Sequence, residues 1–303
     1  MNPLVSVLIP NYNHSKFLDE RIQSVLNQKY QNFEVIVLDD YSTDNSKNVI
    51  EKYRSNPKIS HIIYNESNSG STFKQWNKGF KLCKGDYIWI AESDDVADSY
   101  FLSSIINAIT TTENCVIAFT NSHFINSESE IINYKDHTKR LKGLSINGTD
   151  FVRKYMLGIN NIYNASSAVF KKEVLNKIDS SLYTQFKASG DRLFWILVSL
   201  QGNVCYIPEK LNYFRQHDNK VTPKAISSGK ASEEDYKIYS LISHRVKLNK
   251  LERMLINGCH FWFNNTLMFE KGVKEKNNLM WKSKDYNFIS ALLFKIMYFF
   301  NYI

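Results

Sequence analysis

Polar side chains follow three apolar runs of the sequence, and these positions hold the residue types that could do chemistry. The run at residues 87–91 ends in Glu92, Asp94 and Asp95. Neighbouring carboxylates repel one another unless water, a proton or a cation lies between them. Oxygen ligands suit Mg²⁺ or Mn²⁺, and a nucleotide diphosphate can complete a coordination shell that one or two carboxylates begin. An acidic turn that caps the next helix is the alternative, but the position directly after a buried strand favours a site for metal and diphosphate.

The other two runs end in residues that suit a nucleobase. The first ends in Pro10, with Tyr12 close behind, and the second ends in Asp39 and Asp40. A tyrosine ring offers a stacking face, and a carboxylate can accept an N–H group from the edge of a base. Each residue alone has a simpler explanation, because Tyr12 can pack within its turn and Asp40 can begin the next helix. Together they predict the nucleotide end of a ligand site.

Alternating strands and helices must position these residues. Continuous apolar runs predict strands, and helical spacing of apolar residues predicts helices between them. The expected strands are residues 5–10, 33–38, 59–64, 87–91, 115–120, 165–170, 204–208 and 210–215. The expected helices are residues 15–28, 42–53, 71–83, 100–110, 150–158 and 190–200. The alternation predicts an α/β fold with a mixed, mainly parallel sheet and helices on both faces, whose ligands bind beyond the carboxyl ends of the strands.

The sequence lacks the glycine-rich loops that often bind phosphate. No G-x-G-x-x-G follows the first strand and no G-x-x-x-x-G-K-S/T occurs, so neither a Rossmann dinucleotide site nor a P-loop ATPase is indicated. A sugar-nucleotide pyrophosphorylase is one alternative, but "NYNHSKF" stands where it needs a glycine-rich basic loop. A non-catalytic nucleic-acid-binding protein would explain the net charge of +8, but carboxylates at three strand ends would repel phosphates.

Residues 5–46, 68–80 and 85–95 together resemble glycosyltransferase family 2, whose members have the GT-A fold. The resemblance is strong to about residue 102, looser to residue 217 and absent beyond. It implies a donor site that includes Pro10, Tyr12, Asp40 and Asp94, and a metal ligand at Asp95. Glu92 replaces the usual first acid of the family's metal motif, and its role stays open. Gln75 and Trp76 resemble a subfamily signature, and Trp76 is expected in the core.

Two later motifs complete the resemblance. In "SGDRLFW", Asp191 opens a helix at the place where the family has its general base. A plain helix cap is the alternative, and the helix N-terminus should lower the pKa of this residue. In "YFRQH", the resemblance implies that Arg215 binds phosphate oxygens and that His217 ligates the metal or contacts the diphosphate.

The resemblance implies an inverting glycosyltransferase with Mn²⁺ or Mg²⁺ as its cofactor. It would move a sugar from a nucleotide donor, most simply a UDP-sugar, to a hydroxyl group of a glycan or lipid-linked glycan in bacterial surface polysaccharide synthesis. Nucleic acid is not expected as a partner. The chain would be organised as a catalytic domain at residues 1–220, with a donor half at 1–100 and an acceptor half at 101–220, and a helical region at 221–303.

Composition bears on where the protein acts. Four scattered cysteines and no secretory signal predict a cytoplasmic location. Residues 224–285 hold 12 Lys and Arg against 7 Asp and Glu, a net of +5, and residues 286–303 are apolar but short for a bilayer span. Either the helical region lies at an anionic membrane surface, or it packs against the catalytic domain or a twin subunit in a homodimer. Residues 221–235 are expected to form a linker.

Overall fold

The computed structural model describes residues 2–133, 141, 143, 145–217 and 221–299. The strands are β1 (Val5–Asn11), β2 (Phe33–Asp39), β3 (Ile59–Tyr64), β4 (Tyr87–Ile90), β5 (Val96–Ala97), β6 (Cys115–Ile125), β7 (Ile131–Ile132), β8 (Ser145–Asn147), β9 (Ala168–Lys171) and β10 (Asn203–Arg215). The α-helices are α1 (Ser15–Leu26), α2 (Ser46–Glu51), α3 (Thr72–Phe80), α4 (Phe101–Thr111), α5 (Gly148–Phe151), α6 (Ser181–Thr184), α7 (Gly190–Ser199), α8 (Val221–Ser227), α9 (Lys230–Ser243), α10 (Lys250–Thr266), α11 (Val273–Met280) and α12 (Phe288–Phe299). A π-helical turn spans Val152–Met156, and short 3₁₀ turns span Ala165–Ser167 and Lys172–Lys177.

One mixed sheet forms the centre of the molecule, in the order β3-β2-β1-β4-β9-β6-β10-β5. The strands β3, β2, β1 and β4 pair in parallel, and so do β6 and β10. Between these two groups lies β9, which runs antiparallel to both β4 and β6. The long strands therefore all point in one direction, as the sequence predicts for a mainly parallel sheet, and their carboxyl ends lie along one edge.

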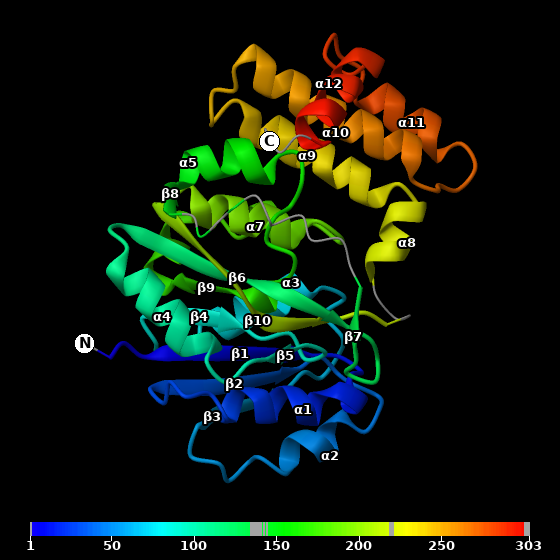
Figure 1. Cartoon of the computed structure of the whole chain (residues 1–303). Coiled ribbons are helices and arrows are strands. Elements are labelled where there is room, and N and C mark those ends of the chain that lie inside the picture. The colour runs from blue at the N-terminus through cyan, green and yellow to red at the C-terminus, as the bar shows by residue number, and fades with distance from the viewer. Residues whose placement is uncertain (1, 134–140, 142, 144, 218–220, 300–303) are drawn as a thin grey trace.

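Alternation within β1 explains why both faces of the sheet are covered. Val7 and Ile9 face a core that includes side chains of α1, α2 and α4, whereas Leu8 faces a core that includes side chains of α3 and α7. Successive side chains of a strand point to opposite faces, so an apolar run buried on both sides needs a layer of helices on each. Figure 1 shows these two layers, with α1 and α2 on the side opposite α7.

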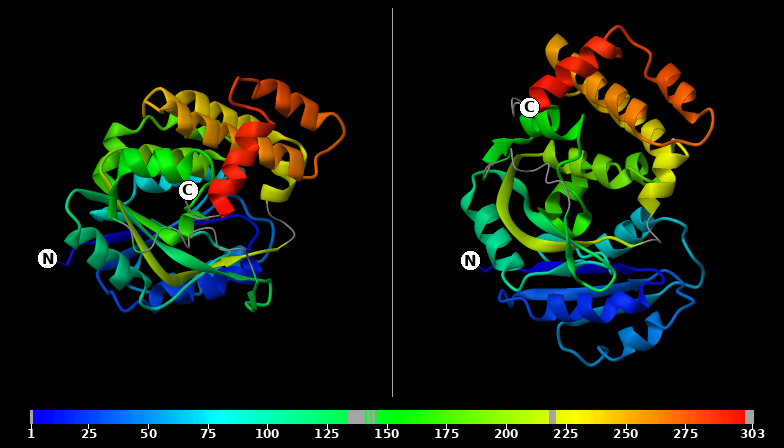
Figure 2. Two further views of the ribbon diagram at one scale, coloured as in Figure 1. Left: turned by 45° about the horizontal axis from the view of Figure 1, so that its top comes forward. Right: turned by 45° about the vertical axis from the view of Figure 1, so that its right-hand side comes forward.

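The C-terminal helices gather on one side of the molecule, over α7 (Figures 1 and 2). Ile238 and Ile242 of α9 belong to the same hydrophobic core as the side chains of α7. The expected linker at residues 221–235 is wrong, because this stretch forms α8 and the start of α9. Gly229, with φ of 75°, makes the turn between the two helices. The side chains of Ala225 and Ile238 are buried, which the Gly and Ser content of the segment does not predict. The division of the chain at residue 220 stays a prediction.

The polar stretch at residues 121–149 begins as strand. β6 extends to Ile125 and pairs with β7 in a short hairpin, and β8 pairs with β10. Part of this stretch, residues 134–140, 142 and 144, lies outside the described residues. All four cysteines are described and none forms a disulfide. Among the described helices, none combines the length and apolar character that crossing a bilayer requires.

Candidate functional site

A cleft of about 730 Å³ opens at the carboxyl ends of β1, β2 and β4. Its lining includes seven of the eight residues that the sequence singles out: Pro10, Tyr12, Asp40, Asp94, Asp95, Asp191 and His217. These residues come from three strand ends, the first turn of α7 and the segment after β10. Arg215 is the exception. The carboxyl edge of the sheet thus brings together residues that lie up to 207 positions apart, from Pro10 to His217.

Asp39 and Asp40 are both buried, but only Asp40 belongs to the lining of the cleft. Asp39 ties two loops together, since its carboxylate accepts hydrogen bonds from Asn11 Nδ2 at 2.7 Å and Ser42 Oγ at 2.6 Å. Asp40 lines the cleft and is held from behind, because Gln75 Nε2 donates to its Oδ1 at 2.9 Å and Ser69 Oγ donates to its Oδ2 at 2.7 Å. A carboxylate oxygen accepts more than one hydrogen bond, so Asp40 Oδ2 can still accept from a ligand.

Tyr12 lies beside Asp40 in the lining of the cleft with 47% of its surface exposed. Half of this large aromatic side chain is therefore open to solvent in the free protein. An exposed ring next to a fixed carboxylate suits the flat, hydrogen-bonding ring of a nucleobase. The pairing of Tyr12 and Asp40 at a nucleobase stays a prediction.

Asp95 is buried and its carboxylate is engaged on both oxygens. Oδ1 accepts from the backbone N–H of Arg215 at 2.9 Å, and Oδ2 accepts from Asn164 Nδ2. Burial, with the neighbouring charge of Asp94, raises the pKa of Asp95. These bonds tie the end of β4 to β10. Asp95 also lines the cleft, and its role as metal ligand stays a prediction.

Asp94 instead meets two histidines. Its Oδ2 lies 3.0 Å from His217 Nε2, and ligand atoms of His14, Asp94 and His217 all lie within 4.8 Å of one another. His14 Nδ1 is 2.8 Å from Ser93 Oγ, which fixes its ring beside Asp94. Sequence reasoning missed His14. The signal available was its position two residues after Tyr12, in the turn at the end of the first strand.

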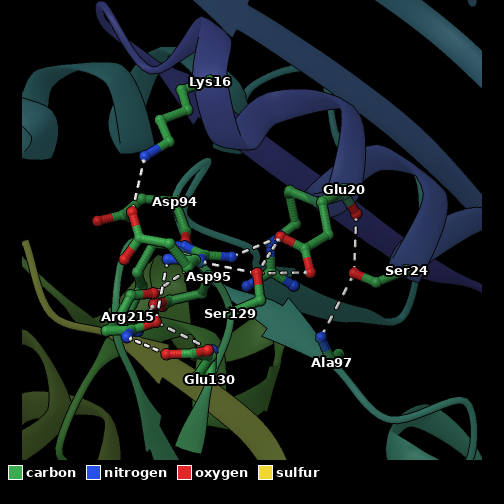
Figure 3. A network of polar contacts seen from close by, with 12 residues as sticks. Lys16, Glu20, Ser24, Asp94, Asp95, Ala97, Ser129, Glu130 and Arg215 are labelled. Carbon is green, nitrogen blue, oxygen red and sulfur yellow. Dashed lines mark hydrogen bonds and ion pairs between the residues drawn. The ribbon is translucent and has the colours of Figure 1, made fainter.

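Arg215 lies beneath the cleft and is fully buried. Its Nε donates to the backbone oxygen of Asp94 at 2.6 Å, while its terminal nitrogens donate to Glu20 Oε2 at 2.5 Å and to Ser129 Oγ at 3.0 Å (Figure 3). The guanidinium also stacks on Phe17, 4.6 Å from the ring centroid. The prediction that Arg215 binds phosphate therefore needs correction, because its hydrogen-bonding capacity is directed at the protein.

A second arginine that the sequence does not single out lies under the acidic residues. Arg21 is fully buried in α1, and its Nε donates to the backbone oxygen of Glu92 at 2.8 Å. Within the described part of the chain, the two terminal nitrogens of Arg21 have no hydrogen-bond acceptor. Burial lowers the pKa of Arg21 to about 10, which leaves it charged at neutral pH, and the charges of Asp95 and Asp94 act against this decrease.

Glu92 is joined to α3. Its Oε1 accepts from Trp76 Nε1 at 2.9 Å, and Trp76 is buried as predicted. Burial, and then the charge of Asp94, raises the pKa of Glu92 to about 8. Gln75 and Trp76 therefore each donate a hydrogen bond to one acid of the cleft, Gln75 to Asp40 and Trp76 to Glu92.

Asp191 occupies the first turn of α7 and lines the cleft. Burial raises the pKa of Asp191 to about 6, although the backbone N–H of Arg192 acts in the opposite direction. The expectation that the helix N-terminus lowers this pKa is thus wrong in its net result, because desolvation outweighs the helix. A carboxylate with a raised pKa is a stronger base, and it remains mostly ionised at neutral pH.

The chain is similar in sequence to known glycosyltransferases. Residues 6–179 match the family described as glycosyl transferase family 2. Glycosyltransferase GlyG of Streptococcus pneumoniae serotype 4 is 27% identical over 238 residues, which cover 73% of each chain. The poly(ribitol-phosphate) beta-N-acetylglucosaminyltransferase TarS of Staphylococcus aureus is 28% identical over 302 residues, covering 95% of this chain and 49% of TarS. The present chain thus spans about half the length of TarS.

Solved structures show the same fold. Residues 1–349 of S. aureus TarS, in complex with UDP-GlcNAc, match with a TM-score of 0.62 and 20% identity, covering 86% of this chain and 71% of that one. A mannosyltransferase from Pyrobaculum calidifontis, in complex with GDP-Man and Mn²⁺, matches with a TM-score of 0.58 and 12% identity, covering 99% and 81%. The architecture predicted from the alternating pattern is confirmed as that of the GT-A glycosyltransferases.

Proposed function

The chain belongs to glycosyltransferase family 2, and from this premise we propose that it moves a sugar, with inversion, from a UDP-linked donor to a hydroxyl group of a bacterial surface glycan. The observation that supports this most is the meeting of Tyr12, Asp40, Asp94 and Asp191 in one cleft. The TarS structure contains UDP-GlcNAc, which makes this sugar nucleotide the first donor to test. Family membership removes the pyrophosphorylase and nucleic-acid-binding alternatives.

The nucleotide binds at the ends of β1 and β2. Tyr12 stacks on the base, Pro10 lines the same end of the cleft, and Asp40 accepts the N–H group of the uracil edge. Asp40 is suited to this because Gln75 and Ser69 fix the orientation of its carboxylate before a ligand arrives. A preoriented acceptor loses little conformational freedom on binding.

The group formed by His14, Asp94 and His217 holds the divalent cation. The donor set fits, since its ligand atoms lie within 4.8 Å of one another and include one carboxylate and two imidazoles. Two imidazoles favour Mn²⁺ over Mg²⁺, which prefers oxygen ligands. When bound, the cation supplies positive charge to the departing diphosphate. In this proposal Asp94, and not Asp95, is the carboxylate ligand of the cation. The oxygens of Asp95 accept hydrogen bonds from Asn164 and from the backbone N–H of Arg215.

Asp191 removes the proton from the acceptor hydroxyl. The raised pKa of Asp191, about 6, lies close enough to neutral pH for efficient proton transfer while the carboxylate stays ionised. The diphosphate is held at the strand ends, and Asp191 activates the acceptor on the other side of the sugar. The acceptor oxygen therefore attacks the face of the sugar away from the leaving group, which inverts its configuration. Residues 1–100 then form the donor half and residues 101–220 the acceptor half.

The acceptor reaches the enzyme at an anionic membrane surface. Helix α12 exposes four apolar side chains on successive turns: Phe288, Ile289, Leu292 and Ile296. Exposed lysines accompany them at positions 282, 284 and 295. An apolar helical face next to lysines matches the boundary between acyl chains and anionic headgroups. We place the protein in the cytoplasm, at the inner face of the cell membrane, and treat a homodimer through the same face as the competing outcome.

A panel of donors tests the proposed activity. UDP-GlcNAc, other UDP-sugars and GDP-mannose are each mixed with the full chain and Mn²⁺, and both nucleotide release and thermal stability are measured. We expect UDP-sugars to raise the melting temperature and to release UDP slowly, and we expect UDP itself to compete. No thermal shift and no release with any donor, with or without metal, would reject the assignment.

A further inference from the structure

A buried carboxylate of the C-terminal region lies directly behind the loop that leads into α7. Glu234 of α9 is 2% exposed. Its two oxygens accept hydrogen bonds from three successive backbone N–H groups, those of Lys187 at 2.9 Å, Ala188 at 2.8 Å and Ser189 at 2.8 Å. Hydrogen bonds to an ionised acceptor are among the strong ones in proteins, and three from consecutive residues fix the path of the loop.

The residue beside Glu234 holds the other side of Asp191. Asp235 forms a salt bridge with Arg192, 2.9 Å from Nη1 to Oδ1, and Arg192 is 6% exposed. The same guanidinium donates to the backbone oxygen of Met156 from Nε at 2.8 Å and from Nη2 at 2.6 Å. Two neighbouring acids of α9 therefore bind the chain on both sides of Asp191. Glu234 binds the backbone of residues 187–189, and Asp235 binds the side chain of Arg192.

The loop held in this way forms one wall of the cleft. Lys187, Ala188 and Asp191 all line it. On the opposite side the loop packs against α3, where a Cβ atom on Gly190 would come within 2.5 Å of the ring of Phe73. The loop thus lies between α3 of the donor half and α9 of the C-terminal region, with no space to shift toward α3.

We propose that Glu234 is a positioning residue for transfer, which sets the location of Asp191 through the backbone of residues 187–189. The C-terminal helices then complete the active site in addition to covering the catalytic domain. This inference rests on the proposed role of Asp191 as base. It predicts that loosening the loop lowers the rate of the chemical step and leaves the donor end of the cleft unchanged, because a base displaced by about 1 Å loses much of its effect.

The test compares Glu234→Gln with the matched control Glu233→Gln in the full chain. Glu233 precedes Glu234 on α9, but its side chain is 25% exposed and pairs with Lys276 and Lys230 at the surface. For Glu234→Gln we expect faster amide hydrogen exchange in the segment 187–191, a kcat lower by about tenfold, and a donor KM within about twofold of wild type. Glu233→Gln should match wild type in all three measurements.

The exchange measurement requires no donor and so separates the possible failures. Unchanged exchange at residues 187–191, or faster exchange with an unchanged kcat, overturns the inference while the proposed function stands. A wild-type enzyme that transfers no sugar overturns the proposed function, and the catalytic part of the inference falls with it. If Glu234→Gln does not fold, Glu234→Asp provides the same comparison, because the shorter side chain keeps the charge but cannot reach all three N–H groups.

Discussion

At the level of single residues, a buried arginine explains how three acids can lie at the end of one strand. Arg21 sits beneath Glu92, Asp94 and Asp95, and it contacts the chain there through the backbone oxygen of Glu92. Its positive charge favours the ionised form of Asp95. The proton that burial keeps on Glu92 reduces the repulsion further, since the pKa of Glu92 is raised to about 8.

The metal assignment gives the first prediction. Replacing His14 with Asn should weaken Mn²⁺ binding by at least about tenfold, because one of three protein ligands is lost. Isothermal titration of the free protein with MnCl₂, without any donor, measures this directly. His61→Asn, a change on β3 away from the cleft, is the control and should bind as wild type does.

The same titration discriminates between the two neighbouring aspartates. Asp94→Asn should abolish binding of Mn²⁺, whereas Asp95→Asn should chiefly lower the melting temperature, because its amide nitrogen cannot accept the hydrogen bond from Asn164 Nδ2. Full loss of Mn²⁺ binding in Asp95→Asn, together with normal binding in His14→Asn, would restore Asp95 as the ligand.

The raised pKa of Asp191 predicts how transfer depends on pH. The base acts only when ionised, so kcat should rise with pH up to about 6 and level off above it. Measuring kcat between pH 5 and pH 8 at saturating donor, with steps of half a unit, tests this. A rate that stays level down to pH 5 would show that Asp191 is not the titrating base.

Stability should change with pH in the opposite sense. Burial raises the pKa of Asp191 from 3.8 to about 6, so between these values the folded protein binds more protons than the unfolded chain. The free energy of unfolding therefore falls as pH rises through this window. Asp191→Asn removes the titration, and it should be more stable than wild type at pH 8 by on the order of 1 kcal/mol, with the gain absent near pH 4.

At the level of elements, α3 donates hydrogen bonds that hold two acidic side chains of neighbouring strands in place. Gln75 and Trp76 are consecutive residues of α3, and they reach Asp40 at the end of β2 and Glu92 at the end of β4. One helix thus fixes acids at two strand ends. The sequence shows that Trp76 is apolar enough for the core, but only the fold shows what its N–H group contacts.

Trp76→Phe tests this support. The change keeps an aromatic ring in the core but leaves the carboxyl group of Glu92 without its N–H donor, so we expect the free energy of unfolding to fall by on the order of 1–3 kcal/mol. Urea unfolding followed by circular dichroism measures the effect. Lys74→Ala, an exposed change on the same helix, should lie within about 0.5 kcal/mol of wild type. Equal stability of Trp76→Phe and Lys74→Ala would mean that the bond to Glu92 contributes nothing.

Local pattern predicts the elements well up to Asp95, because the strands there are rich in apolar residues and each long helix has its own apolar face. It says less about how they pair. Nothing in residues 165–170 indicates that β9 runs against its neighbours, since strand direction follows from the path of the chain and not from composition. Residues 221–235 were predicted as linker because their glycine and polar content outweighs the few apolar residues that become buried.

At the level of the whole molecule, the exposed apolar face of α12 distinguishes one side of the enzyme. Ile289→Asp combined with Leu292→Asp should reduce cosedimentation with vesicles of phosphatidylglycerol and phosphatidylcholine by at least about fivefold, because charge opposes burial among acyl chains. These residues are 71% and 47% exposed, so the double change should leave the fold intact. Equal vesicle binding of wild type and the double variant would reject α12 as the membrane-binding face, and a shift from dimer to monomer would assign the face to a second copy.

Long-range contacts set the limit on predicting the site. Seven of the eight singled-out residues line one cleft because strand ends converge in any sheet of this type. Arg215 was misplaced because a sequence does not show whether a guanidinium faces a ligand or a buried carboxylate such as Glu20. His14 and Glu234 were missed for the same reason. Their partners lie 203 and 45 or more positions away, at His217 and at Lys187 to Ser189.

The most direct test of the central claim compares transfer and donor binding in wild type and Asp191→Asn. Both proteins receive UDP-GlcNAc, or whichever sugar nucleotide the donor panel selects, with Mn²⁺ and acceptor, and UDP release and the donor dissociation constant are measured side by side. We predict a rate lower by about 10²- to 10⁴-fold with a dissociation constant within about threefold of wild type, because the base does not contact the nucleotide. Near wild-type turnover in Asp191→Asn would contradict the account.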